Sequence, residues 1–194
     1  MSPRTKQQVE GIRAESTNKI LMAAMELFAT NGYPGTSVNA IAKNAGVSKG
    51  LIYNYFESKE AIVKGLIAMM LKMADDIMDK AVSEKTESPK QELKILIDVF
   101  IDSIEQQMEM MRWILPLAFQ MSKFSFVNDM VTGKIESLIG VMRSIFERLG
   151  YDDPEREAWL LGAIMDGLSM DLAVMPGYEI DKMHKYLYVK YNLM

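Results

Sequence analysis

Apolar residues recur at helical spacing along nearly the whole chain, and no stretch shows the strict alternation of apolar and polar residues that a half-buried strand requires. The spacing therefore predicts an all-α protein of about nine helices. We expect helices over about 13–31, 37–45, 49–56, 58–82, 89–104, 108–122, 128–149, 153–175 and 179–191. Pro116 interrupts one of these ranges and should kink or split it.

Residues 37–59 contain the most informative pattern, a helix, a tight turn and a short second helix. Val38, Ile41 and Ala42 share one face of the first helix, and Gly46 follows at a position that suits a left-handed C-cap. Ser48 is placed to cap the second helix. Two short helices joined in this way form a helix-turn-helix, whose second helix fits the major groove of DNA.

Other residues predict where helices start and end in the rest of the chain. Ser88, Pro89 and Gln91 predict a helix start with an N-cap serine, a proline in the first turn and a capping-box glutamine. Asp153 and Pro154 predict another helix start, and Pro176 with Gly177 its end.

Composition excludes several classes of site. Cysteine is absent and His184 is the single histidine, so thiolate catalysis, cysteine-based zinc sites and multi-histidine metal sites are excluded. We find no phosphate loop and no paired acids at metal-binding spacing, and we expect neither an enzyme nor a cofactor. A polar N-terminus and the lack of a run of about 20 apolar residues predict a cytoplasmic protein that does not enter membranes.

Charge is distributed unevenly, although the chain as a whole carries a formal net charge of −4. Residues 1–60 hold seven Lys and Arg against five Asp and Glu, whereas residues 61–194 hold fifteen against twenty-one. The basic excess lies with the helix-turn-helix, where it favours contact with phosphates.

The segment from Thr36 and Ser37 to Lys59, above all Val-Ser-Lys-Gly at 47–50 and Ile-Tyr-Asn-Tyr-Phe-Glu-Ser-Lys at 52–59, resembles the DNA-binding domain of the TetR family of transcriptional regulators. The resemblance covers about residues 12–70. It implies a DNA-binding domain over residues 1–57, with three helices, and a helical effector-binding and dimerisation domain over 58–194. It also implies a dimeric repressor that binds a palindromic operator and is released by a small effector.

Side chains at the start of the recognition helix should reach base edges, and hydroxyls at the start of the preceding helix should hold a phosphate. In the family, residues that match Tyr53, Tyr55 and Lys59 typically contact phosphates. Tyr55 could equally belong to the core beside Phe56. The candidate DNA-binding residues are Thr36, Ser37, Lys49, Gly50, Leu51, Tyr53, Asn54, Tyr55 and Lys59.

Helix pairing is suggested by the helix over 153–175, which is apolar almost all round, as a helix buried on two sides must be. The resemblance implies a two-fold dimer whose interface comes from the last two helices; a larger monomeric core is the alternative. The candidate interface residues are Leu161, Gly162, Met165, Asp166, Ser169, Leu172 and Ala173.

Eighteen methionines are many for a chain of this length, and several crowd with aromatic residues around Pro116. Methionine suits adaptable binding surfaces, so this segment could line a pocket for a small apolar or aromatic effector, although ordinary core packing would use the same residues. The candidates are Phe100, Met108, Met111, Trp113, Phe119, Met121 and Phe124. The competing functional hypothesis is an all-helical carrier or sensor of small molecules that has lost DNA binding.

Overall fold

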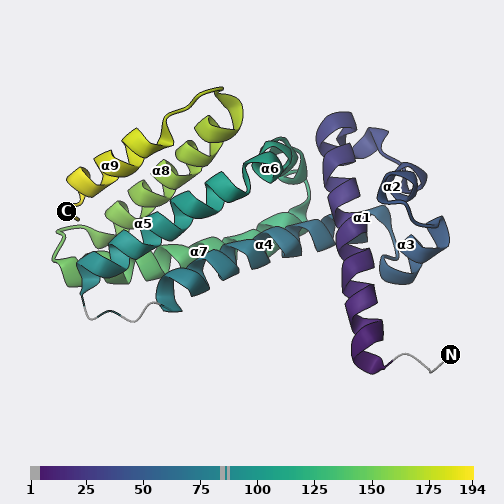
Figure 1. Ribbon diagram of the computed structural model, residues 1–194, viewed down its shortest axis with the longest axis horizontal. Helices are drawn as coiled ribbons and strands as arrows, with labels where there is room; N and C mark the ends of the chain where they lie inside the picture. Colours follow the sequence, from purple (N-terminus) through teal and green to yellow (C-terminus); the bar gives the residue numbers. More distant parts are fainter. Residues whose placement is uncertain (1–4, 84–85, 87) are drawn as a thin grey trace. The chain divides into compact units, whose positions relative to one another are not determined.

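A computed structural model describes residues 5–83, 86 and 88–194, apart from the side chains of Lys6, Val82, Ser83 and Phe119. The described residues form helices and no strand, which confirms the all-α prediction (Figure 1). Their helices are α1 (Lys6–Gly35), α2 (Val38–Ala45), α3 (Lys49–Tyr55), α4 (Lys59–Ser83), α5 (Pro89–Gln106), α6 (Met108–Met121), α7 (Ser125–Leu149), α8 (Pro154–Val174) and α9 (Ile180–Lys190).

The chain divides into two compact units. Unit 1 comprises residues 1–69 and 116–127, and unit 2 comprises residues 70–115 and 128–194. The division falls inside α4, at Pro116 inside α6 and after Val127 inside α7, so these three helices contribute residues to both units. Helical periodicity carries no sign of this division, because it does not change where a helix passes from one unit to the other.

One helix starts earlier than predicted, and another starts at the predicted residue but is capped differently. The first helix begins at Lys6 rather than near Arg13, because Thr5 and Gln8 form a reciprocal capping box that the sequence analysis missed. At the start of α5, Ser88 makes no side-chain cap and Gln91 is not a capping-box partner. Instead the Thr86 hydroxyl donates to the Gln91 side chain and accepts from the Ser88 amide at 3.2 Å.

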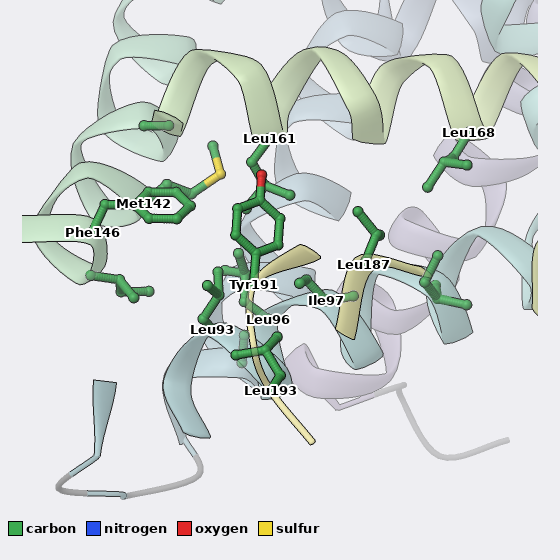
Figure 2. Close-up of a cluster of buried hydrophobic side chains, with 14 of the residues drawn as sticks. Leu93, Leu96, Ile97, Met142, Phe146, Leu161, Leu168, Leu187, Tyr191 and Leu193 are labelled. Carbon is green, nitrogen blue, oxygen red and sulfur yellow. The ribbon is translucent and has the colours of Figure 1, made fainter. Parts of the chain in front are cut away.

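Unit 2 has a core of apolar side chains mainly from α5, α7, α8 and α9, to which Ala81 of α4 is added. Ile97, Phe146 and Leu161 are fully buried in it, and Tyr191 packs among them from the end of the chain (Figure 2). Burial of apolar surface from four helices supplies most of the favourable free energy of folding in such a bundle.

A polar cluster joins α5 to α9 beside that core. Asp98 accepts hydrogen bonds from the Lys94 ammonium at 2.8 Å and from the Tyr188 hydroxyl, and it lies 2.7 Å from Nε2 of His184. Burial alone would raise the pKa of the Asp98 carboxyl, but these hydrogen bonds outweigh it and hold the pKa below its usual value. The single histidine of the chain is thus part of a helix-to-helix contact.

Two isoleucines one turn apart on α7 test the burial pattern. Ile139 is 6% exposed and lies against α8, whereas Ile135 is 40% exposed. We expect Ile139→Ala to lower the free energy of unfolding by roughly 3 kcal/mol, because it removes buried methyl groups and leaves a cavity. Ile135→Ala should cost about 1 kcal/mol or less. Urea denaturation of both variants measures the difference, and equal losses would contradict this packing.

Candidate nucleic-acid interface

The helix-turn-helix at α2 and α3 is built from local hydrogen bonds. The Ser37 hydroxyl caps α2 by accepting from the Ala40 amide at 3.1 Å, and the Ser48 hydroxyl caps α3 by accepting from the Leu51 amide at 3.1 Å. Between them, Gly46 has φ +66°, a left-handed conformation that costs glycine little because it has no Cβ. These contacts join residues close to one another in the sequence, so the local sequence is enough to determine the turn.

Apolar side chains hold the two helices in place. Ile41 and Ala42 of α2, Ile52 of α3 and Phe56 just after it are all buried within unit 1. Tyr55 is half-buried, and the guanidinium of Arg13 from α1 lies 5.5 Å from the centre of its ring. Arg13 is therefore a neighbour of the recognition helix, a contact between distant residues that the sequence pattern did not reveal.

The opposite face of α3 is open. Lys49, Gly50, Tyr53 and Asn54 are exposed, and Leu51 is half-buried. The Lys49 ammonium lies 5.9 Å from the centre of the Tyr53 ring, so the two side chains share one surface. A cation, a phenol and an amide are groups that donate hydrogen bonds to phosphates and base edges.

Thr36 and Lys59, which the sequence predicts as phosphate ligands, make contacts within the protein. Thr36 is only 2% exposed, and its hydroxyl is within 3.0 Å and 2.9 Å of the Leu27 and Gly32 carbonyl oxygens. The Lys59 ammonium donates to the carbonyls of Tyr33 at 2.7 Å and Thr36 at 2.9 Å. Both side chains hold the corner between α1 and α2, and Lys59 has one N–H left for any other acceptor.

The expected effector-binding residues are divided between the two units. Phe100, Met108, Met111 and Trp113 are half-buried residues of unit 2. Met121 and Phe124 belong instead to unit 1, where Met121 is fully buried and Phe124 packs against Tyr33. The side chain of Phe119 lies outside the described residues.

Unit 2 contains an open cavity of about 550 Å³, a volume typical of small-molecule sites. Met73 and Ile77 of α4 contribute apolar surface, and Asp76, Asp79 and Lys80 bring charge. Gln107, next to Met108, lies at the same cavity. The expected residues Phe100, Met111 and Trp113 do not line it.

The expected interface residues on α8 are turned mainly inward. Leu161 and Ala173 are buried in unit 2, Met165 and Leu172 pack against its core, and a Cβ on Gly162 would lie 3.5 Å from Ile139. Asp166 is exposed and Ser169 is half-buried, with its hydroxyl bonded to the Met165 carbonyl at 3.0 Å. The exposed apolar stripe of α8 consists of Trp159, Ala163, Gly167, Met170 and Val174.

The described residues contain no group of three or more His, Cys, Asp and Glu side chains placed to share a metal ion. None of their helices combines the length and the apolar content that crossing a membrane requires.

Comparisons with known proteins agree with this site. The family model of bacterial regulatory proteins of the tetR family matches residues 20–66, which include α2 and α3. The HTH-type transcriptional regulator EthR of Mycolicibacterium smegmatis is 37% identical over 84 residues, covering 43% of this chain and 39% of the relative. The fatty acid metabolism regulator protein of Bacillus subtilis is 40% identical over 72 residues, covering 34% and 37%. The matched part of the chain thus spans less than half the length of these relatives.

The fold is shared over a longer range. A putative transcriptional regulator from Saccharomonospora viridis, solved in complex with choline, has a TM-score of 0.72 and 21% sequence identity. That similarity covers 92% of this chain and 97% of the other. Residues 20–66 of the chain, which include the exposed recognition helix, therefore match the tetR family of bacterial regulatory proteins, and 92% of the chain shares the fold of a solved transcriptional regulator.

Proposed function

We propose that this protein is a sequence-specific, DNA-binding transcriptional regulator, a dimeric repressor that a small and largely apolar or aromatic effector releases from its operator. The observation that carries the proposal is the open face of α3, where Lys49, Tyr53 and Asn54 are exposed while Ile52 anchors the opposite face. Side chains at the start of a docked recognition helix reach base edges in the major groove.

Each exposed group of α3 has a role that its chemistry suits. Lys49 donates to guanine O6 and N7, and Gly50 lets the backbone approach the groove. Tyr53 and Asn54 contact phosphates or base edges, as does the exposed Ser37 at the start of α2. Leu51, half-buried, has only part of its side chain free to pack on a thymine methyl.

The dimer forms, in this proposal, through α8 and α9. Trp159, Met170 and Val174 lie on one exposed stripe of α8, and Tyr186 and Val189 of α9 are exposed as well. Large apolar side chains gathered on one surface mark protein interfaces, and a two-fold dimer suits a palindromic operator. This stripe replaces Leu161 and Ala173 as the proposed interface, because those two residues are buried in the protomer.

The effector is the least constrained part of the proposal. The half-buried residues Phe100, Met108, Met111 and Trp113 give unit 2 an adaptable, methionine-rich interior, and the cavity at Met73 and Ile77 adds apolar surface. One relative is named for fatty acid metabolism and one neighbouring structure holds choline. The methionine and aromatic side chains favour an acyl chain or an aromatic compound over a small cation.

DNA recognition is tested first by selecting bound fragments from genomic DNA and measuring the affinity of the best fragment at several salt concentrations. Lys49→Ala combined with Tyr53→Ala should weaken that affinity by at least about tenfold, since each removed contact is worth about 1–3 kcal/mol. Lys90→Ala, which removes an exposed lysine from unit 2, is the control and should bind as the wild type does.

A short palindrome bound far more tightly than random DNA supports the proposal. Weak binding that is indifferent to sequence and suppressed by salt would leave only the electrostatic component. If effectors still bound in that case, the carrier hypothesis would replace the regulator.

Dimerisation is tested by Met170→Glu, which places a charge on a side chain that is 49% exposed on α8. A buried, unpaired carboxylate in an interface is costly, so we expect the dimer to dissociate at concentrations at which the wild type stays dimeric. Sedimentation velocity measures this. Ile135→Glu puts the same charge on the exposed side of α7 and should leave the dimer intact; dissociation of both variants or of neither would contradict the proposed surface.

Effector binding is tested by adding a medium-chain acyl-coenzyme A, benzoate or choline to the protein and to its operator complex. A true effector at one hundred times its dissociation constant should raise the free energy of unfolding by about 2.7 kcal/mol and lower operator affinity. We expect this from an acyl or aromatic compound, with Met111→Asp weakening the response. A response to choline alone would contradict the proposed chemistry of the effector.

A further inference from the structure

The corner between α1 and α2 is held by a residue far away in the sequence. Oε1 of Gln120, near the end of α6, accepts a hydrogen bond from the backbone amide of Tyr33 at 3.2 Å. The two residues are 87 positions apart and belong to the same compact unit. A segment in the middle of the chain is therefore part of the unit that carries the helix-turn-helix.

The amide of Tyr33 has a particular need for this acceptor. Gly32 has φ +74° and interrupts the helical conformation of α1, so the chain turns just before Tyr33. A backbone amide without a partner away from water costs free energy comparable to a lost hydrogen bond. Gln120 supplies the acceptor at this bend.

The ring of Tyr33 is packed between aromatic side chains and a lysine. Phe124 meets it edge-on with ring centres 5.0 Å apart, and Phe28 lies 5.4 Å away. The Lys59 ammonium lies 4.2 Å from the ring centre and bonds the Tyr33 carbonyl. Burial raises the pKa of the Tyr33 hydroxyl, as does the nearby charge of Glu60.

We propose that Gln120, supported by Phe124, is a positioning residue for DNA binding: it fixes the corner from which α2 starts and thereby sets the orientation in which α3 is presented. The inference rests on the proposed function. It adds a residue that is not among those proposed to contact DNA. Gln120 touches no base or phosphate in this role, and acts only through Tyr33.

The course of α6 gives its two halves contacts in different units. On the other side of Pro116, the Arg112 guanidinium donates to the Ala173 carbonyl at 3.2 Å, near the end of α8 in unit 2. Proline has no N–H, so the hydrogen-bond ladder of α6 is weakest at Pro116, where the chain passes from unit 2 to unit 1. One helix thus has a polar anchor on each side of its weakest point.

The test compares two substitutions of similar size. Gln120→Met removes the acceptor but keeps a long helix-forming side chain, whereas Gln120→Glu keeps an oxygen that accepts from the Tyr33 amide. Ala118→Gln, at an exposed position of the same segment, is the control. Operator affinity is measured well below the unfolding temperature, and hydrogen exchange of the Tyr33 amide is followed by NMR.

In Gln120→Met we expect hydrogen exchange of the Tyr33 amide to be faster and operator affinity to be about five- to tenfold weaker. The reason is that a smaller fraction of molecules then holds the α1–α2 corner in the conformation that binds DNA. Gln120→Glu and Ala118→Gln should keep the wild-type affinity. A purely structural role would lower the unfolding temperature of Gln120→Met and leave its affinity unchanged, which would overturn the inference.

The two proposals fail in distinguishable ways. Wild-type protein that binds no operator would overturn the proposed function and this inference with it. Wild-type protein that binds operator, with Gln120→Met binding equally well, would overturn the inference alone. Unchanged exchange of the Tyr33 amide in Gln120→Met would show that the hydrogen bond does not hold the corner, with the same consequence.

Discussion

One half-buried ammonium group joins the start of α4 to the corner between α1 and α2. Lys59 opens α4, yet its side chain bonds the carbonyls of Tyr33 and Thr36 at the opposite end of the DNA-binding segment. Hydrogen bonds from a charged donor are about twice as strong as neutral ones, so this contact closes the three-helix unit into a loop. The Thr36 hydroxyl, bonded to two carbonyls of α1, strengthens the same corner. The orientation in which α3 is presented to DNA depends on how firmly this corner is held.

Local chemistry explains why the recognition helix was predictable. Serine caps at Ser37 and Ser48 and the left-handed Gly46 act within four residues of themselves, so their effect can be read directly from the sequence. The apolar period predicts that Leu51 or Ile52 is buried and that Tyr53 and Asn54 are exposed, and the structure buries Ile52. The family resemblance rests on these same residues.

Contacts between residues far apart in the sequence limit what could be predicted from the sequence alone. Lys59 stands where the family resemblance places a phosphate-binding lysine. Nothing in the neighbouring sequence indicates that it bonds two carbonyls more than twenty residues away. Gln120 is likewise an ordinary polar residue at the end of a helix until its bond to Tyr33 is seen. The helix over 153–175 is apolar almost all round, so periodicity could not decide which of its sides faces the core. The structure turns Leu161 inward and leaves Met170 and Val174 exposed.

Residues 116–127 lie in the second half of the chain but complete the first unit. Chimeric regulators are commonly conceived by joining the DNA-binding segment of one protein to the sensing domain of another. A cut at residue 57 or 69 of this chain would leave the Tyr33 amide without Gln120 and its ring without Phe124. The transplantable module is therefore discontinuous, and an acceptor domain would have to provide a matching glutamine and aromatic residue at the end of its own α6 equivalent.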